Sequence, residues 1–453
     1  MLSLGIDIGT SKISLNVIDL STGLSLANYN LANNSNIPTD NEAFRCQDPL
    51  KIRNITLDLL EKALNDYPDI KSIGITGQMH GILYVDKFNE IKSPLFTWQD
   101  QSGNLLIDES TSYAERLSLL TKYKMASGYG LTTYYYHQKN HIHYGSASYI
   151  TTIHSHIGSY LANNTELLLH NSDAHSLGLF DLKKKSFDKE AFKNASLDFS
   201  IMPKTSSAFL PLGYYKDKIL VALALGDNQA SVIGSGTNKQ DILLNIGTGS
   251  QVSIITNKSK NKEDNIEIRP LAYNDNIFVG AALSGGHSFY LLKRFFEQAF
   301  SMANLQAPDN LYQIMIEEVL SKDIKNPLEF NTLFNGSRDN PRKRASIENI
   351  EEKNFNPAHL IDATAAGIIN ELYMMYQAMD KKDFTPKRII GCGNGIRKNI
   401  LLVKHIKKIF DLPLVMPINQ EEAAFGASLA AGLASGYFSN LEEAQRIIKF
   451  QNI

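Results

Sequence analysis

A pattern of alternating apolar and polar residues, broken by a turn of small residues, occurs twice in this chain. Residues 2–19 read LSLGIDIGTSKISLNVID, and residues 241–255 read DILLNIGTGSQVSII. Alternation on both sides of a turn rich in Gly, Thr and Ser predicts a β-hairpin in each stretch. Because the two stretches align turn on turn, the chain reads as two related halves.

Both turns have the composition of a phosphate-binding loop. Gly, Thr and Ser leave backbone N–H groups unobstructed and add hydroxyl donors. One such turn also ends ordinary hairpins, but two matched copies are suited to holding one polyphosphate between two lobes. The predicted phosphate-binding residues are Gly9, Thr10, Ser11 and Lys12 in the first turn, and Gly247, Thr248 and Gly249 in the second.

Only the first copy carries a carboxylate, because Asp7 stands where the second copy has Asn245. Mg²⁺ prefers one or two carboxylates, with waters and phosphate oxygens completing its shell. The sequence therefore predicts a Mg²⁺ site at Asp7, on the first half.

Length and composition fit a two-domain globular protein, divided by the repeat into 1–236 and 237–453. The 453 residues include 45 Lys and Arg against 47 Asp and Glu, so no basic excess attracts nucleic acid or an anionic membrane. Two cysteines are too few for a disulfide framework, which indicates a reducing compartment, expected to be the cytoplasm. No signal peptide is expected, and the apolar run 423–434 is too short to cross a bilayer.

Several loops carry polar residues that a site could use. The loop 77–81, GQMHG, is expected to present Gln78, Met79 and His80, although a histidine there is also typical of a core position satisfied by a carbonyl. Trp98, the single tryptophan, lies two residues before Asp100, and a unique tryptophan is more often a core residue than a ligand platform. The polar stretch 33–49 is expected to be an exposed loop.

Two strand-to-helix turns also carry residues that a binding site could use. Asp227 and Asn228 follow the apolar strand 220–225 after one glycine, Gly226, at a place where side chains project into a cleft. Asp227 is also a fitting helix N-cap, and the residues alone leave both roles open. In the turn GCGNG, the three glycines Gly391, Gly393 and Gly395 let the backbone lie flat against a ring or phosphate before a helix over 396–410. A lone turn of this kind is unspecific.

Apolar spacing predicts the main helices over 50–66, 288–300, 362–379 and 421–436. The segment 171–181, NSDAHSLGLFD, is predicted to be a strand and a turn. Five histidines lie between 137 and 156, and their HxH spacing suits zinc, but no Cys or carboxylate nearby completes a site, so solvated or structural roles are favoured.

Taken in order, these motifs resemble the FGGY carbohydrate kinases of the sugar kinase, chaperone ATPase and actin superfamily. The resemblance runs almost end to end, through DIGTSK, GQMHG, TWQD, SDAHSLGLFDL, GDNQAS, NIGTGS and GCGNGIRKN. GQMHG and GDN are similar to the ketose-kinase branch, while TWQD and the segment 335–346 look closest to the sedoheptulokinases. The resemblance implies an α/β protein of two duplicated ribonuclease H-like domains around a central cleft.

The resemblance also implies roles for particular residues. It assigns the catalytic base to Asp227 and the Mg²⁺-associated carboxylate to Asp7. It assigns ATP binding to the two phosphate turns and to an adenosine site at Gly391, Gly393, Asn394 and Arg397. The sugar contacts fall on Gln78, Met79, His80, Trp98, Asp100 and Asn228. Two departures stand out, since Gln101-Ser102 replaces a Gly-Arg found in many relatives and Cys392 replaces a usual glycine.

The expected reaction is therefore phosphorylation of the terminal hydroxyl of a ketose by ATP, with sedoheptulose as first substrate and xylulose as the alternative. The expected partners are the ketose and ATP, in a monomer or homodimer. A rival from another class is a non-catalytic regulator that keeps the ATPase fold, but such a protein needs no Gln78, His80 or Asp227.

Overall fold

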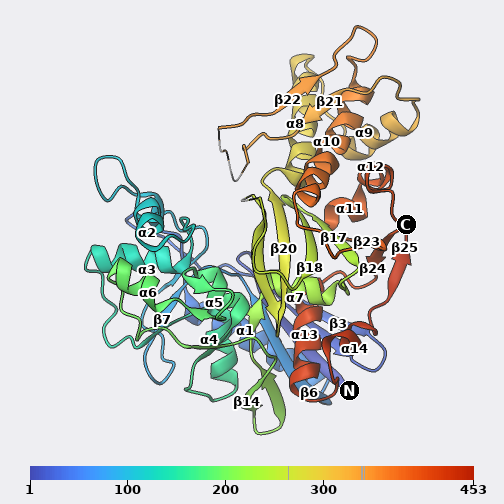
Figure 1. Ribbon diagram of the computed structural model, residues 1–453. Coiled ribbons are helices and arrows are strands. Elements are labelled where there is room, and N and C mark those ends of the chain that lie inside the picture. Colours follow the sequence, from blue (N-terminus) through green and yellow to red (C-terminus); the bar gives the residue numbers. More distant parts are fainter. Residues whose placement is uncertain (264, 338–339, 341) are drawn as a thin grey trace. The chain divides into compact units, whose positions relative to one another are not determined.

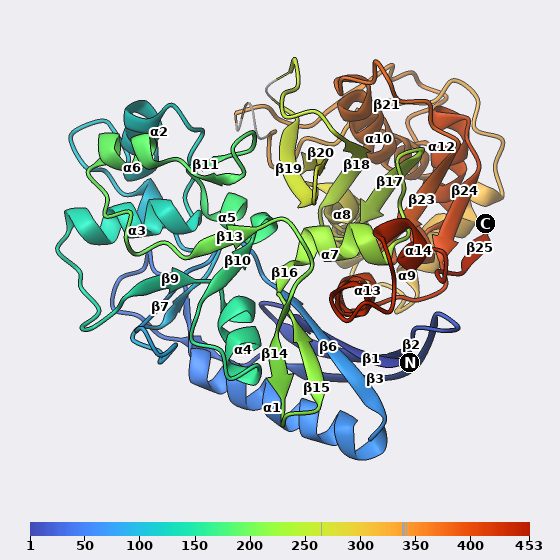
Figure 2. The same ribbon diagram turned by 60° about the horizontal axis from the view of Figure 1, so that its bottom comes forward.

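The computed structural model describes residues 1–263, 265–337, 340 and 342–453. Of the segment 335–346 named above, residues 338, 339 and 341 lie outside this description. The chain forms two compact units (Figures 1 and 2). Unit 1 comprises Met1–Gly236, Pro270–Asp275 and Glu421–Lys449, and unit 2 comprises Thr237–Arg269, Asn276–Gln420 and Phe450–Ile453. The predicted boundary at 236/237 is thus one of several places where the chain passes between units.

Unit 1 is built on a seven-stranded sheet of order β14-β15-β6-β1-β2-β3, with β16 as a further partner of β6. Strand β1 pairs antiparallel with β2, as the hairpin prediction requires, and parallel with β6. The strands are β1 (Leu2–Ile8), β2 (Lys12–Asp19), β3 (Leu24–Ala32), β6 (Ile70–Gly77), β14 (Pro211–Tyr215), β15 (Ile219–Ala222) and β16 (Leu225–Gly226).

The second sheet repeats this pairing. Its order is β19-β20-β18-β17-β23-β24-β25, and β17 pairs antiparallel with β18 and parallel with β23, as β1 does with β2 and β6. The duplicated α/β architecture is confirmed. The strands are β17 (Asp241–Ile246), β18 (Ser250–Thr256), β19 (Glu267–Ala272), β20 (Asp275–Ala282), β23 (Arg388–Cys392), β24 (Leu414–Pro417) and β25 (Phe450–Asn452).

The predicted long helices are present. Helix α1 (Pro49–Asp66) starts where the Asp48 carboxylate accepts from the N–H groups of Leu50 and Lys51, which are otherwise unpaired at a helix start. The other predicted helices are α8 (Gly285–Met302), α10 (Pro357–Gln377) and α13 (Glu422–Ala434), while the helix expected over 396–410 is divided at Asn399 into α11 (Asn394–Lys398) and α12 (Ile400–Phe410).

The remaining helices are shorter. They are α2 (Tyr113–Thr121), α3 (Gly130–Lys139), α4 (Ile153–Leu161), α5 (Asn171–Leu177), α6 (Lys189–Ala195), α7 (Asp227–Gly234), α9 (Leu311–Leu320) and α14 (Leu441–Gln445).

Two local predictions are wrong. Residues 171–177 form helix α5 rather than a strand, because a seven-residue segment rich in Ser, Asn and Asp has little helical pattern of its own and is held by contacts from other elements. The stretch 33–49 is not wholly a loop, since β4 (Asn36–Ile37) and β5 (Cys46–Gln47) pair with each other and β5 pairs with β8 (Leu95–Phe96).

Helix α13 lies directly on the unit 1 sheet, although it is separated from β1 by more than four hundred residues. A Cβ added to Gly5 would lie 1.8 Å from the carbonyl oxygen of Ala424, and one added to Gly74 would lie 1.8 Å from that of Ala427. Gly5 and Gly74 are neighbours across β1 and β6. Helix and sheet backbones therefore meet with no side chain between them. Figure 2 shows α13 beside α7, β1 and β6.

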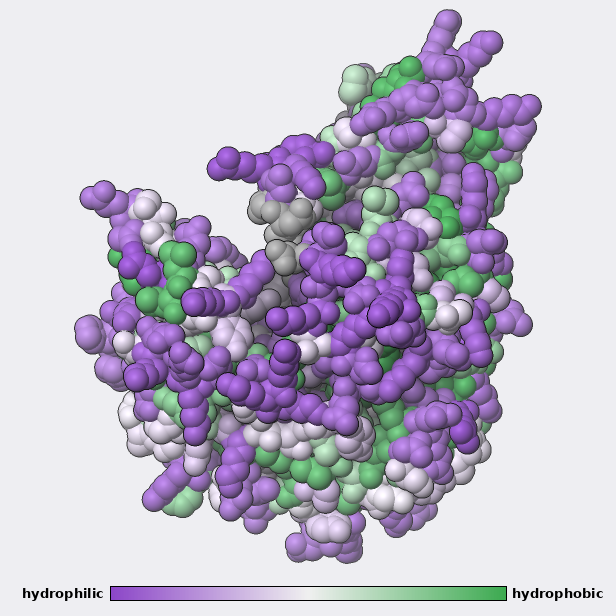
Figure 3. Space-filling view, viewed as in Figure 1, coloured by the Kyte–Doolittle hydropathy of each residue, from purple (hydrophilic) through white to green (hydrophobic). Residues whose placement is uncertain are grey.

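Hydrophilic side chains cover much of the face shown in Figure 3, and hydrophobic ones form separate smaller areas. In the part of the chain that the structure describes, no helix has both the length and the apolarity needed to cross a membrane.

We expect Gly74→Ala to destabilise unit 1 by about 3 kcal/mol, because the added methyl group overlaps the α13 backbone and the helix must move. Urea unfolding followed by Trp98 fluorescence measures this, since the single tryptophan lies in unit 1. Gly158→Ala is the control, because its Cβ would have no neighbour closer than 3.5 Å and helix α4 gains an alanine. Equal losses in both variants would contradict the packing argument.

Candidate active site

The candidate catalytic carboxylates of unit 1 lie where three parallel strands end. Asp7 is opposite Thr76 in the pairing of β1 with β6, and Leu225 is opposite the same Thr76 in the pairing of β16 with β6. Asp227 follows two residues after Leu225. Because parallel strands end at the same edge of a sheet, this edge brings Asp7 and Asp227 together, as ligand sites in α/β proteins require.

Asp227 is not a helix N-cap. The N-cap of α7 is Gly226, which makes no side-chain capping hydrogen bond, and Asp227 is the first helical residue. Asp227 and Asn228 are both partly exposed, whereas the next residue, Gln229, is fully buried and donates to the carbonyl of Pro270 at 2.9 Å. The alternative structural role for Asp227 is therefore wrong, and its carboxylate is accessible for chemistry.

Asp7 has an unusual electrostatic environment. Desolvation by the surrounding atoms, followed by repulsion from Asp227 and Glu421, raises its pKa from 3.8 to about 7, although Lys12 and His154 act in the opposite direction. Lys12 Nζ forms an ion pair with Glu421 at 3.0 Å. The three acids at this edge repel one another, so a bound cation would stabilise the ionised form of Asp7.

A cation at Asp7 would need further ligands from a substrate or from water. Among residues 1–263, 265–337, 340 and 342–453, no three His, Cys, Asp or Glu side chains are grouped closely enough to form a metal site alone. Mg²⁺ is usually held in this way, by one or two carboxylates together with phosphate oxygens and waters. The donor set at Asp7 therefore fits a phosphate-bound Mg²⁺.

The Thr10 side chain joins the first phosphate turn to the predicted sugar loop. Its hydroxyl donates to Gln78 Oε1 at 3.2 Å and accepts from Trp98 Nε1 at 2.9 Å. Gln47 donates to the Thr10 carbonyl at 2.8 Å and accepts from Gln78 Nε2 at 2.8 Å. A single hydrogen-bonded network therefore contains one predicted phosphate-binding residue and two predicted sugar-binding residues.

The GQMHG loop differs in part from the expectation that its polar side chains are presented. Gln78 is only 3% exposed, and Met79 is buried against Gly226, where a Cβ would approach the Met79 side chain to 2.6 Å. His80 is partly exposed and has a positive φ of 70°. Only His80 of these three is partly exposed, whereas Gln78 and Met79 are buried.

His80 is fixed on two sides. Its Nδ1 donates to the Ser176 carbonyl at 2.7 Å, its backbone N–H donates to Ser176 Oγ at 3.2 Å, and its ring stacks on Tyr129 with centroids 4.8 Å apart. A carbonyl oxygen only accepts, so Nδ1 carries the hydrogen and Nε2 is the acceptor of the neutral ring. A carbonyl does satisfy His80, as the structural alternative expected, but the residue is partly exposed rather than in the core, and its ring is held in one orientation.

The TWQD loop divides into an exposed and a buried part. Trp98 is 47% exposed, so it is not a core residue, whereas Asp100 is fully buried. The Asp100 carboxylate accepts from Ser102 N–H at 3.0 Å, from the Ser102 hydroxyl and from Arg45 N–H at 3.3 Å. Burial raises its pKa, which these hydrogen bonds oppose. Ser102, one of the two departures noted in the sequence, therefore serves to hold Asp100, whose sugar contact stays a prediction.

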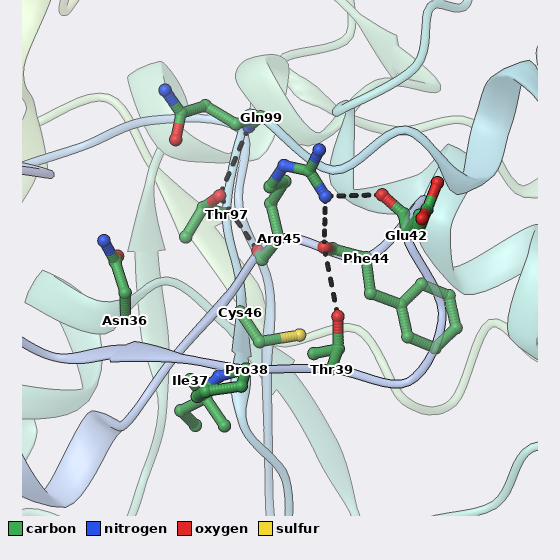
Figure 4. A pocket seen from close by; sticks show the side chains of 10 residues that line it. All are labelled: Asn36, Ile37, Pro38, Thr39, Glu42, Phe44, Arg45, Cys46, Thr97 and Gln99. Carbon is green, nitrogen blue, oxygen red and sulfur yellow. Dashed lines mark hydrogen bonds between the residues drawn. The ribbon is translucent and has the colours of Figure 1, made fainter.

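A cavity of about 440 Å³ adjoins this loop on unit 1 (Figure 4). The Arg45 carbonyl accepts from the N–H and the hydroxyl of Thr97, and the Arg45 guanidinium donates to the Phe44 carbonyl at 2.9 Å. Cys46 also lines the cavity, and burial raises the pKa of its thiol to about 12. The 39–46 segment thus supports the segment that carries Trp98.

In unit 2, the second phosphate turn contacts two other glycine-rich segments. The N–H groups of Gly286 and His287, at the start of α8, donate to the carbonyls of Gly247 and Thr248 at 2.9 Å each. Gly393, with φ of 86°, lies so close that a Cβ would approach the Ile246 carbonyl oxygen to 2.5 Å. The turn 247–249 and the predicted adenosine turn therefore lie side by side within this unit.

Arg397 links the helix after the adenosine turn to residues 417–419. Its guanidinium donates to the carbonyls of Pro417 and Asn419 at 3.1 and 3.2 Å, so it connects α11 to the segment after β24. Asn394 begins α11, and Cys392, the second departure from relatives, is buried at the end of β23. The nucleotide contacts of Gly391, Gly393, Asn394 and Arg397 stay predictions.

The histidines between 137 and 156 separate into two groups. His137, His154 and His156 are fully buried and hydrogen-bond to Tyr84, Asp173 and Asn89 respectively, whereas His141 and His143 are exposed. The buried three have structural partners.

Sequence reasoning missed several residues that shape the site. Glu421 reaches Asp7 only because α13 packs on the first sheet, and Gln47 was placed in a loop. Ser172 and Ser176 were placed on a strand, yet they contact Gly226 and His80. The i, i+4 spacing of the two serines was the only signal available for a shared helix face.

Comparison with known proteins finds relatives for both halves of the chain. The N-terminal domain of the FGGY family of carbohydrate kinases matches residues 2–243, and its C-terminal domain matches residues 243–435. Sedoheptulokinase from Mus musculus is 23% identical, covering 94% of this chain and 96% of the relative. Xylulose kinase from Staphylococcus xylosus is also 23% identical, covering 97% and 92%.

Solved structures share the fold. A ligand-bound xylulose kinase from Lactobacillus acidophilus matches with a TM-score of 0.84 at 18% identity, covering 100% of this chain and 93% of that one. Plasmodium falciparum glycerol kinase with ADP matches with a TM-score of 0.82 at 17% identity, covering 98% and 92%. The fold expected from the motifs is confirmed, and this chain belongs to the FGGY family of carbohydrate kinases.

Proposed function

We propose that this protein transfers the terminal phosphoryl group of ATP to the terminal hydroxyl of a ketose, with sedoheptulose as the preferred substrate. The observation that carries the proposal is the meeting of Asp7 and Asp227 at the ends of three parallel strands, beside the Thr10 turn and the His80 loop. The end-to-end similarity to two mammalian sedoheptulokinases supports the choice of sugar.

Asp227 is the proposed general base. Phosphoryl transfer to an alcohol needs a group that orients the attacking hydroxyl and accepts its proton. Asp227 is partly exposed at the start of α7, and its negative charge contributes to the raised pKa of Asp7. A carboxylate in this position accepts a hydrogen bond from the sugar hydroxyl, and then its proton, as the new P–O bond to the sugar forms and the bond to the β-phosphate oxygen breaks to release ADP.

Asp7 is the proposed anchor for Mg²⁺, and the two Thr-containing turns are the proposed phosphate-binding sites. When bound, Mg²⁺ neutralises charge on the phosphates of the nucleotide. Lys12, next to the first turn and paired with Glu421, adds a positive charge there. In unit 2, the turns at 247–249 and 391–394 are proposed to bind the rest of ATP, supported by their close contact.

The sugar is proposed to contact His80, Asn228 and Trp98. His80 offers Nε2 as an acceptor in a fixed orientation, and Trp98 offers an exposed ring for an apolar sugar face. Gln78 and Asp100 are both buried. They are proposed to affect sugar binding indirectly, by fixing the loops that carry the sugar-contacting residues. A site built from fixed polar groups discriminates strongly, because a substrate lacking the matching hydroxyl leaves a buried group unpaired.

Xylulose is the second candidate substrate, because the curated xylulose kinase relative covers 97% of this chain and several structural matches are xylulose kinases. A regulator without catalysis would release no ADP in response to a ketose. Cys46 and Cys392 are both buried and neither is in a disulfide, which supports the proposal of a reducing, cytoplasmic location. We propose a monomer or homodimer as the functional form.

The substrate is tested by coupled ADP-release assays with sedoheptulose and xylulose side by side. We expect kcat/KM for sedoheptulose to exceed that for xylulose by about tenfold or more, since one well-matched polar contact accounts for roughly this factor. The reverse ratio would make the protein a xylulose kinase. ADP release independent of either sugar would contradict a ketose kinase.

Asp227→Asn should lower kcat by about 10²- to 10⁴-fold, because the amide cannot accept the proton. Sugar binding, followed by Trp98 fluorescence, should persist. Asp48→Asn is a matched control on the same unit, since Asp48 caps α1 and lies in no predicted site. A wild-type rate in Asp227→Asn would show that another group is the base.

Asp7→Asn should stabilise the cation-free protein at high pH. The native pKa of Asp7, about 7, exceeds its unfolded value near 3.9, so its contribution to stability is lost as pH rises from about 4 through 7. From pH 5.5 to 8 this loss is about 2 kcal/mol in the wild type, and the uncharged variant avoids it. Thermal unfolding in EDTA at the two pH values measures the difference.

Asp19→Asn is the control for this experiment. Hydrogen bonds from Ser21 lower the pKa of Asp19, so its carboxylate is ionised in both states at both pH values. The change in Tm caused by Asp19→Asn should therefore be equal at pH 5.5 and 8. The same pH-independent result for Asp7→Asn would contradict the electrostatic account of the site.

A further inference from the structure

We propose that Ser172 and Ser176, on helix α5, are positioning residues with separate tasks: Ser172 places the catalytic base segment and Ser176 places the sugar-binding histidine. This inference rests on the proposed function, because it assigns supports to Asp227 and His80. The two serines are one helical turn apart and almost fully buried, with exposures of 0% and 2%. Neither serine belongs to the set of residues proposed above to contact substrate or nucleotide.

Ser172 fixes the start of α7. Its hydroxyl oxygen accepts from the N–H of Gly226 at 2.9 Å, and Gly226 is the N-cap residue immediately before Asp227. Gly226 is the last residue of β16 and is buried, so its N–H would be costly to leave unpaired. Ser172 therefore sets the position from which the Asp227 side chain begins.

The hydrogen of the Ser172 hydroxyl also has a defined direction. His170 Nδ1 accepts from the Ser172 N–H at 3.2 Å, so this nitrogen carries no hydrogen and accepts from the Ser172 hydroxyl at 2.8 Å as well. Burial lowers the pKa of His170 to about 4, which keeps the ring neutral near pH 7. The Ser172 oxygen therefore has its lone pairs directed to Gly226, and the serine cannot rotate without losing two bonds.

Ser176 fixes the His80 loop. Its hydroxyl donates to the Asp173 carbonyl at 2.8 Å and accepts from the His80 N–H at 3.2 Å, while its carbonyl accepts from His80 Nδ1 at 2.7 Å. His80 has a positive φ, which is costly for a residue with a side chain and persists where neighbours enforce it. Ser176 is a principal source of that enforcement, with Tyr129 stacking on the ring.

Helix α5 itself is anchored independently of both serines. Asp173, between them, binds His154 at 2.8 Å, and both side chains are fully buried. The carboxylate oxygen Oδ1 makes this contact from the helix to α4. Because the anchor lies elsewhere, removing either hydroxyl changes one support and leaves the helix in place.

This arrangement makes a matched pair of variants. Ser172→Ala and Ser176→Ala delete the same atom from the same helix at nearly the same burial. Ser172→Ala should lower kcat about tenfold with the ketose KM changed less than twofold, since misplacing a base by a fraction of an ångström reduces the rate of transfer. Ser176→Ala should raise the ketose KM about tenfold with kcat changed less than twofold. The KM for ATP should stay unchanged in both.

A second readout does not depend on turnover. Titration of Trp98 fluorescence with the ketose should give a Kd raised about tenfold in Ser176→Ala and unchanged in Ser172→Ala. Ser159→Ala is the control, because Ser159 is also buried in unit 1 but lies on α4 without a hydrogen-bond partner for its hydroxyl. Its kinetics and Kd should match the wild type. If Ser172→Ala fails to fold, Ser172→Cys takes its place with the same expected direction.

The proposed function and the separate tasks of Ser172 and Ser176 are contradicted by different results. Wild-type protein that transfers no phosphate to sedoheptulose or xylulose would overturn the proposed function. An active wild type in which both variants change kcat and KM alike, or in which both change only Tm, would overturn the division of tasks on α5 and leave the proposed function standing.

Discussion

The direct packing of α13 on Gly5 and Gly74 is the constraint on which the candidate site depends. Helix and sheet meet backbone to backbone, because a Cβ at either glycine would overlap a carbonyl of α13. Glu421 immediately precedes this helix, so the same packing brings Glu421 to Lys12 and into the field of Asp7. The close approach of one helix thus determines the charge balance at the strand ends.

That charge balance has a functional meaning. Three acids share one sheet edge, and the protein compensates them only in part, through Lys12 and His154. In the free protein the result is a raised pKa and a loss of stability at neutral pH, which is typical of sites prepared for a positively charged ligand. Around the acids, uncharged hydrogen bonds from Gln47, Gln78 and Thr10 give the loops their positions.

The sequence predicted those helices and strands in which apolar residues recur with a clear periodicity. The repeated hairpins, α1, α8, α10 and α13 were all recognisable, and their pairing followed from the duplication. Prediction failed where structure comes from distant partners: α5 has no clear helical pattern, Gln78 is buried and hydrogen-bonded to Gln47, and Asp100 is held by Ser102 and Arg45. For the site, residue types and motifs were informative, but which side chains project and which support them depended on tertiary contacts.

The return of residues 421–449 to unit 1 also bears on how the protein forms during synthesis. The first two hundred and more residues leave the ribosome long before α13, so the glycine surface on β1 and β6 has no covering helix in the meantime. Unit 2, apart from its terminal strand β25, is made in between. The N-terminal sheet therefore acquires the helix that completes its core only after most of unit 2 has been synthesised.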